Sequence, residues 1–172
     1  GCGEDTTTIG SWWGSPDTRV GGIVGALDYV KSNKLTVSDL KNTGNVTGSK
    51  YVGGVMGYVH TKNGSTMSKS YNYSNVKGSI SYIGGLIGYT ENLALDSCKN
   101  TNSQVSCDGY EILTDGTYIT YLGGFVGCGY AISNSTNEVA ITYEKEGKYT
   151  KETLVCKVLG KIGVISYCGY IP

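Results

Sequence analysis

The chain has 172 residues, enough for one domain with a hydrophobic core but too few for two large domains. Its 14 basic and 14 acidic residues give a formal net charge of zero, so no long-range field would attract nucleic acid or an anionic membrane. Glycine (27) and tyrosine (15) are abundant, proline (2) is scarce, and no helical stripe of apolar residues is sustained, which excludes a helical bundle and indicates a β-rich protein.

No stretch approaches the roughly 20 apolar residues that cross a bilayer, and no signal peptide is seen, so we expect no direct insertion into a membrane. Six cysteines without a Cys-x-x-Cys pair argue against a zinc ribbon or a thioredoxin-type site. Up to three disulfides in an oxidising compartment are one interpretation, with Cys128 pairing with Cys156 or Cys168, and buried free thiols are the other.

Residues 1–19 precede the first regular unit and are expected to form an end cap. Trp12 and Trp13 stand before the first glycine pair as Thr47 stands before the second, so they are predicted to cover the open end of the core. The alternative is a ligand platform, because an exposed tryptophan face suits a sugar ring or another apolar partner.

A six-residue box of the pattern apolar-Gly-Gly-apolar-apolar-Gly then recurs along the chain. Its second glycines, at positions 22, 54, 85 and 124, are 32, 31 and 39 residues apart, a period typical of a solenoid. Adjacent glycines permit a positive φ or a close approach to a neighbouring layer. The structural repeat glycines are Gly21, Gly22, Gly25, Gly53, Gly54, Gly57, Gly84, Gly85, Gly88, Gly123, Gly124 and Gly127.

A phosphate-binding loop is a weaker interpretation of this box. A P-loop requires a lysine and a hydroxyl residue directly afterwards, and a dinucleotide fingerprint requires a following helix. Tyr58, Tyr89 and Cys128 follow the third glycines instead. We therefore expect no nucleotide cofactor, and Cys128 is predicted to occupy the position that Tyr58 and Tyr89 hold in two other units.

An asparagine signature follows each box, as in residues 41–48, 71–78, 98–105 and 133–139. Asparagine before a β-branched residue in this signature is typical of a turn that feeds a strand. Stacked on one another, such asparagines are predicted to form an amide ladder with a structural role.

Two insertions lengthen the later units. Residues 111–120 consist of two β-prone runs joined by Asp115-Gly116, which predicts a hairpin with a type I′ turn. Residues 140–143 and 149–155 flank a longer polar turn at the corresponding place in the next unit, and a second hairpin is predicted there. Two such hairpins at one edge are expected to form a small side sheet, which is either a recognition surface or a packed cap.

The fold class predicted from these signals is all-β, a parallel β-helix-like solenoid of about five layers with two edge β-hairpin insertions. The whole chain, residues 1–172, is predicted to be a single repeat domain. Its units lie near residues 20–50, 51–81, 82–120 and 121–158, and residues 1–19 and 159–172 form the end caps.

The combination of the asparagine signature, a Gly-Ser pair and the glycine box resembles the GLUG repeats of bacterial surface proteins. The likeness covers the units that start at residues 20, 52, 83 and 122. Such repeats occur in large adhesin-like proteins and in the non-catalytic N-terminal region of IgA-cleaving zinc metalloproteases. The resemblance implies a secreted or cell-surface β-solenoid, and it carries over no catalytic residue.

The sequence contains no recognisable catalytic motif. The one histidine, His60, lies in a polar segment and is predicted to be a solvated loop residue, and no His-Glu-x-x-His or Gly-x-Ser-x-Gly motif occurs. Asp-x-Asp-x-Asp calcium loops are also missing. We therefore expect no enzyme activity, no metal and no cofactor in this chain.

The predicted function is a non-enzymatic extracellular module for adhesion or for spacing other domains, with a host or matrix protein or a glycan as partner and no nucleic acid. The alternative is an accessory carbohydrate- or substrate-binding region of a secreted enzyme. A lipid anchor at Cys2 is a further alternative for its location. The candidate ligand-binding residues are Trp12, Trp13, Tyr110, Tyr118 and Tyr143.

Overall fold

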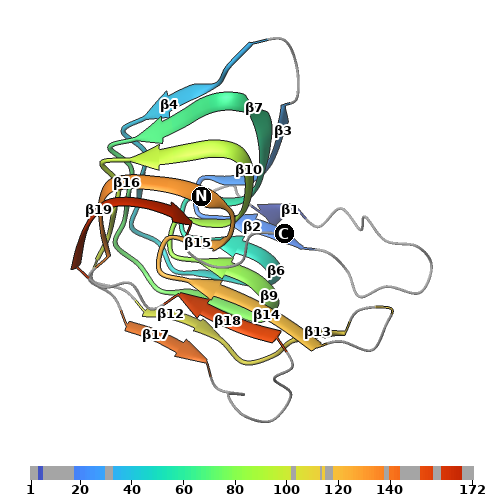
Figure 1. The fold of residues 1–172 in the computed structure, drawn as a ribbon. Coiled ribbons are helices and arrows are strands. Elements are labelled where there is room, and N and C mark those ends of the chain that lie inside the picture. Colours follow the sequence, from blue (N-terminus) through green and yellow to red (C-terminus); the bar gives the residue numbers. More distant parts are fainter. Residues whose placement is uncertain are drawn as a thin grey trace.

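The computed structural model describes residues 4–5, 18–29, 33–101, 104–112, 114, 118–137, 140–143, 152–156 and 160–167. Every regular element in this part of the chain is a β-strand. The strands stack in register in three parallel sheets, which we call the first, second and third faces of a β-solenoid-like stack (Figure 1). The all-β class and the parallel stacking predicted from the sequence are thus confirmed.

Each coil of the stack contributes one strand, or two short ones, to a face. The first face contains β2 (Arg19–Gly21), β6 (Val46–Gly53), β9 (Val76–Gly84), β12 (Gln104–Cys107), β14 (Tyr118–Gly123), β17 (Ala140–Tyr143) and β18 (Glu152–Cys156). The second contains β3 (Val24–Tyr29), β4 (Thr36–Ser38), β7 (Met56–Ser68), β10 (Ile87–Asp96), β15 (Val126–Cys128) and β16 (Tyr130–Asn137). The short third face contains β5 (Lys41–Asn42), β8 (Tyr71–Asn72) and β11 (Lys99–Asn100), and the end of β16 pairs with β11.

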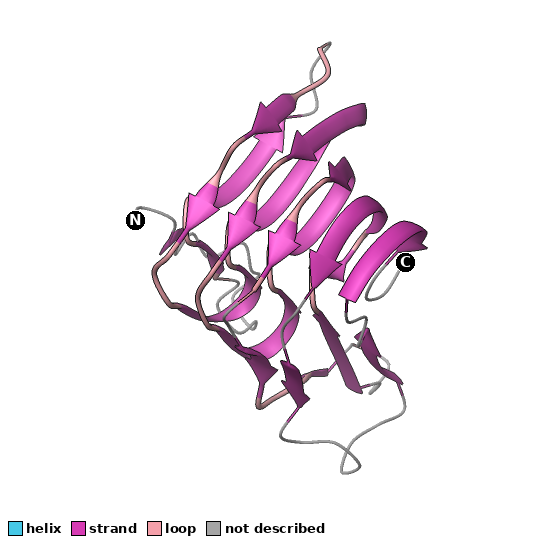
Figure 2. Ribbon diagram, turned by 90° about the vertical axis from the view of Figure 1, so that its left-hand side faces the viewer, coloured by secondary structure: helices cyan, strands magenta, loops and turns pink. Residues whose placement is uncertain are grey.

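The four glycine boxes align from coil to coil, as the sequence repeat predicts. Gly21 pairs with Gly53, Gly53 with Gly84 and Gly84 with Gly123 along the first face. Figure 2 shows the resulting rungs side by side along the stack. On the second face Cys128 pairs with Tyr89, which confirms that Cys128 occupies a position held by an aromatic residue in neighbouring coils.

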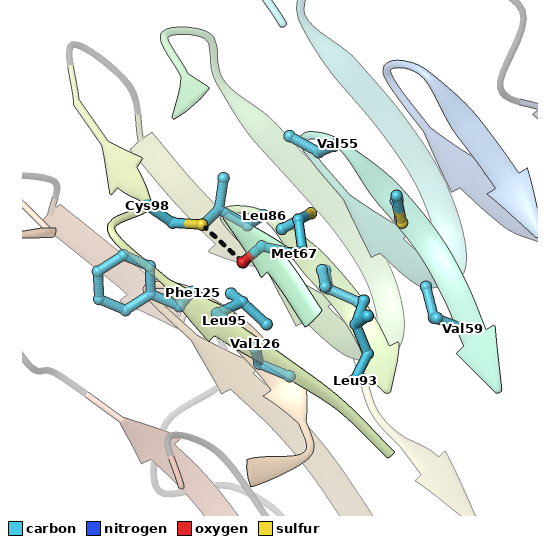
Figure 3. Packing of buried hydrophobic residues seen from close by; sticks show 11 residues of the cluster. Val55, Val59, Met67, Leu86, Leu93, Leu95, Cys98, Phe125 and Val126 are labelled. Carbon is cyan, nitrogen blue, oxygen red and sulfur yellow. Dashed lines mark hydrogen bonds between the residues drawn. The ribbon is translucent and has the colours of Figure 1, made fainter. Parts of the chain in front are cut away.

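Two hydrophobic clusters fill the stack on either side of the boxes. The larger lies inside the second face, where Leu86 and Phe125 of successive boxes pack with Met67 and Leu95 (Figure 3). The smaller lies along the first face and contains Val20, Val46, Val52, Val76, Ile83, Val105, Cys107 and Leu122. The recurring apolar positions of the repeat therefore form continuous columns, and each coil buries its apolar side chains against its neighbours.

The glycine boxes work by close approach and not by positive φ. A Cβ on Gly53 would lie 1.9 Å from the Met56 carbonyl oxygen, and one on Gly57 would lie 2.6 Å from the Tyr51 carbonyl oxygen. Among the described residues, only Gly64 and Gly129 are glycines with positive φ. The first and second faces thus approach each other at each box so closely that a side chain does not fit.

Non-glycine residues form the left-handed corners instead. Asp39, Lys69 and Ser97 have φ values of 61°, 47° and 55° at equivalent positions where the second face turns into the third. Tyr51 and Tyr82, directly before two of the boxes, have φ values of 55° and 60°. A left-handed conformation is uncommon outside glycine, so these positions are held by the packing of each coil on its neighbours.

The antiparallel pairing of the first predicted hairpin is confirmed, and its predicted Asp115-Gly116 turn lies outside the described residues. β13 (Glu111–Ile112) pairs antiparallel with β14, with Glu111 opposite Ile119. The second is wrong in its pairing, because β17 lies parallel on β12 and β18 lies parallel on β14. The described part of that segment follows the register of the preceding coil, and its predicted turn lies outside the described residues.

Antiparallel strands lie at both ends of the stack. β1 (Glu4–Asp5) pairs with β2 of the first coil, and β19 (Gly160–Tyr167) pairs with β16. Covering an edge strand in this way limits edge-to-edge pairing with other chains. In the part of the chain that the structure describes, we find no helix with the length and apolar character that a membrane crossing requires.

Three buried cysteines, Cys98, Cys107 and Cys128, form no disulfide. The interpretation in which Cys128 pairs with Cys156 or Cys168 is therefore wrong. The Cys98 thiol donates toward the Met67 carbonyl oxygen at 3.6 Å (Figure 3). It also donates toward the Asp96 carbonyl oxygen at 3.4 Å. These thiols behave as small apolar residues of the core.

Candidate functional site

A ladder of asparagine side chains runs through the stack. Asn42 Nδ2 donates to Asn72 Oδ1 at 2.9 Å, and Asn72 Nδ2 donates to Asn100 Oδ1 at 2.9 Å. Asn100 Nδ2 then donates to the Gly124 carbonyl oxygen at 2.7 Å. The carboxamide also closes a turn within its own coil, since Asn72 Nδ2 reaches the Ser74 carbonyl oxygen at 2.8 Å. We name this row the asparagine ladder (Asn42, Asn72 and Asn100).

The amide ladder predicted from the asparagine signature is confirmed, and it forms at the first asparagine of the signature. The later asparagines, Asn45 and Asn75, lie three residues further along and are exposed. Those side chains accept from the backbone of the next coil instead, Asn45 Oδ1 from Asn75 N at 3.1 Å and Asn75 Oδ1 from Gln104 N at 2.8 Å. A buried carboxamide must satisfy both donor and acceptor, which only a row inside the stack provides.

The ladder packs directly on the glycine boxes. A Cβ on Gly22 would lie 2.5 Å from the Asn42 carboxamide carbon, and one on Gly54 would lie 2.4 Å from that of Asn72. The two sequence signatures are therefore two halves of one contact. The second glycine of each box leaves the space that the asparagine side chain fills.

A pocket of about 540 Å³ opens at the first-coil end of the stack. It is lined by the first glycine box and the first asparagine signature, residues 20–22 and 41–47. Among the described residues Asn42 Oδ1 accepts one hydrogen bond, from the Gly44 amide at 3.1 Å, whereas Asn72 Oδ1 accepts from both Asn42 and Ser74. The pocket thus exposes the end of the asparagine ladder, and we call it the first-coil pocket.

Two columns of tyrosines flank the boxes on the outside. Tyr51 and Tyr82 stack with centroids 4.7 Å apart and rings 25° from parallel, and Tyr58 and Tyr89 stack at 5.1 Å and 9°. Edge contacts join the columns, such as Tyr51 to Tyr58 at 5.4 Å, and Tyr121 extends the first column. Ring faces that pack on each other are not free to stack on a sugar, so these tyrosine columns are chiefly coil-to-coil contacts.

Charged side chains cover the ends of the tyrosine columns. The Arg19 guanidinium lies 4.3 Å from the Tyr58 ring centroid, and its buried Nε has no hydrogen-bond partner among the described residues. Lys50 Nζ lies 2.6 Å from Glu111 Oε1 and 5.0 Å from the Tyr51 centroid. The Lys50–Glu111 pair therefore fixes the β13–β14 hairpin against the first face.

Burial makes this cluster hard to ionise. Desolvation, and then the nearby Glu111 carboxylate, raise the pKa of Tyr82 above its ordinary value. Desolvation also raises the pKa of Tyr89, and it raises the pKa of the Cys128 thiol to about 12. A catalytic nucleophile requires a lowered pKa, so these groups do not have the properties of one.

His60 does not lie in a solvated loop, so that prediction is wrong. It lies in β7, where its register partners are Asp28 on β3 and Glu91 on β10. His60 Nδ1 is 3.2 Å from Asp28 Oδ1, and Nε2 is 3.6 Å from Glu91 Oε2. Parallel stacking brings one ionisable side chain per coil into a row on the second face, which the local sequence does not reveal.

Of the five predicted ligand-binding residues, the structure describes the side chain of Tyr110, so their grouping into a site stays a prediction. Trp12 and Trp13 lie outside the described residues. Tyr118 and Tyr143 lie in β14 and β17, and their side chains are outside the description. Tyr110 is half-buried in the connection between β12 and β13.

The sequence contained a signal for the tyrosine columns, because tyrosines directly precede or follow the boxes in successive units. The described residues contain no group of three or more His, Cys, Asp and Glu side chains that would hold a metal ion.

Comparison of the chain with known protein families, with curated proteins and with solved structures finds no match.

Proposed function

We propose that this chain is a non-enzymatic, secreted or cell-surface repeat module that binds a partner or spaces other domains of a larger assembly. The observation that carries the proposal is that the repeated residues contact one another from coil to coil. The asparagine ladder, the glycine boxes and the tyrosine columns each contact the same residue type in the next coil. The repeat thus builds a column, and the surfaces of that column remain for recognition.

The balanced charge of the chain supports a protein or glycan as partner over nucleic acid, because a chain with no net positive charge has no long-range attraction for phosphate. The likeness of the glycine box and asparagine signature to repeats of bacterial adhesin-like proteins favours the same location and role. In the accessory carbohydrate-binding alternative, a sugar would be held by Trp12, Trp13 or Tyr110, since the rings in the tyrosine columns pack on each other.

Location and binding are tested separately. Antibody labelling of intact source cells and of the culture medium is expected to detect the chain outside the cytoplasm, and labelling only after permeabilisation would reject an extracellular module. Immobilised matrix proteins and a glycan array are then probed with the purified chain. Trp12→Ala, Trp13→Ala and Tyr110→Ala are compared with Asn63→Ala, an exposed control. Failure of the chain to bind any glycan would reject the carbohydrate alternative.

A further inference from the structure

We propose that the first-coil pocket binds an extended polypeptide segment of the pattern Asn-x-[Gly/Ser]-Asn-Val, supplied by another chain. The inference deepens the proposed function and rests on it for its biological setting, because it names the class of partner. The pocket is lined by the two elements that contact each other across every interior coil boundary, the glycine box and the asparagine signature.

Comparison of the first coil with the second shows what belongs in the pocket. Ser74 is 4% exposed because the first coil covers it, whereas Gly44, at the same place in the first coil, is exposed. Asn72 is 0% exposed and Asn42 is 6% exposed. In the second coil, the space that corresponds to the pocket is occupied by residues 41–47. The first-coil pocket is therefore lined by the same elements as the boundary between two interior coils. It differs in that no asparagine signature of a preceding coil fills it.

The direction of the asparagine ladder specifies the chemistry of the ligand. At each step the Nδ2 group of one coil donates toward the following coil. Asn42 thus presents a carboxamide oxygen toward the pocket, where it accepts only from the Gly44 amide among the described residues. A buried acceptor of this kind is best matched by another carboxamide, which donates one hydrogen and satisfies its own oxygen through its local turn.

Backbone geometry restricts the length of the ligand. β1 pairs with β2 at Arg19 and Val20, so it occupies the part of the first-coil end that a complete additional coil would require. The pocket begins at Val20 and covers the glycine pair and residues 41–47. A segment of about seven residues in extended conformation spans about 23 Å, which suits an added strand with one turn and not a whole coil.

The test uses the isotope-labelled full chain and a blocked peptide with the sequence of residues 69–79. We expect saturable NMR shifts at the Gly22 and Gly44 amides and at the Asn42 side-chain NH2. The peptide that carries Asn72→Ala should bind about tenfold more weakly, because it lacks the ladder hydrogen bonds. Equal binding of the two peptides, or no saturable shift, would overturn the proposal.

A blocked pocket supplies the matched control. Gly44→Arg is suitable because a Cβ at Gly44 would meet its nearest neighbour, Asn42 Oδ1, at 3.8 Å, an ordinary contact. It should abolish peptide binding while the urea midpoint of the chain stays unchanged. Thr43→Arg, at an exposed position in the pocket lining, serves as the second variant if the first does not fold. Concentration-dependent dimerisation of the unliganded chain that Gly44→Arg prevents would assign the pocket to a second copy and overturn the proposal.

These outcomes are independent of cellular location. If a chain found only in the cytoplasm binds the peptide, the proposed function is rejected and the proposal for the pocket stands. If a surface-exposed chain does not bind the peptide, the proposal for the pocket is rejected and the proposed function stands.

Discussion

Replacing Asn72 by alanine removes the central member of the asparagine ladder. The side chain takes part in four hydrogen bonds, of 2.8 Å to Ser74 O, 2.9 Å to Asn100 Oδ1, 2.9 Å from Asn42 Nδ2 and 3.4 Å from Ser74 N. Each is expected to contribute about 1 kcal/mol net, and buried partners that lose a bond add to the loss. We therefore expect the free energy of unfolding to fall by about 3–4 kcal/mol, a large share of the total for a small domain.

The measurement is urea unfolding followed by far-ultraviolet circular dichroism, with the m-value checked for constancy between variants. Asn63→Ala is the matched control, because Asn63 is exposed in β7 and such surface changes usually stay within about 0.5 kcal/mol. Asn42→Ala should lie between the two, since its side chain has a coil on one side only. If Asn72→Ala lowers the free energy of unfolding no more than Asn63→Ala, the structural role of the ladder is refuted.

Gly54→Ala is expected to lower the free energy of unfolding by about 2 kcal/mol or more, because its Cβ would lie 2.2 Å from a carbonyl oxygen of the next coil. Gly44→Ala should change it by less than about 0.5 kcal/mol, and similar losses in denaturant titrations would contradict the close-approach explanation. Stability should fall as pH rises above about 9, because burial raises the pKa of Cys98 to about 11 and of Cys128 to about 12, so the unfolded thiols lose protons first. Unfolding curves at pH 8, 9 and 10 check this, and a flat profile would exclude it. Glu111→Ala should lower stability by about 1–2 kcal/mol, because it removes the carboxylate that lies 2.6 Å from a lysine with 10% side-chain exposure. Retention of full stability in thermal unfolding would show that this ion pair contributes nothing.

The sequence predicts the stack because the period and the register have the same physical origin. Apolar side chains that recur every 31 or 32 residues must be buried against the preceding copy, and this places Val20 on Val52 and Val52 on Ile83. The position of Cys128 beside Tyr89 followed from the same alignment. Contacts between equivalent residues are thus accessible from the sequence alone.

Contacts between residues at different positions in the repeat are not accessible in this way. Lys50 and Glu111 are 61 residues apart, and one of them lies in an insertion. The choice between Asn42 and Asn45 for the ladder was also ambiguous, because both recur with the same spacing and only the path of the backbone turn buries one of them. The sequence left positive φ and close approach as alternatives at the boxes for a similar reason, since glycine pairs suit both.

The antiparallel strands at the two ends have a mechanical consequence. β1 lies on the first coil and β19 on the last, so the described strands nearest the two termini lie at opposite ends of the stack. The hydrogen bonds between coils run along the stack axis, and tension applied through the termini would load them one after another and not together. The column would then lengthen stepwise as β1 or β19 peels away first, and the interior coils would remain folded until their outer neighbour had been removed.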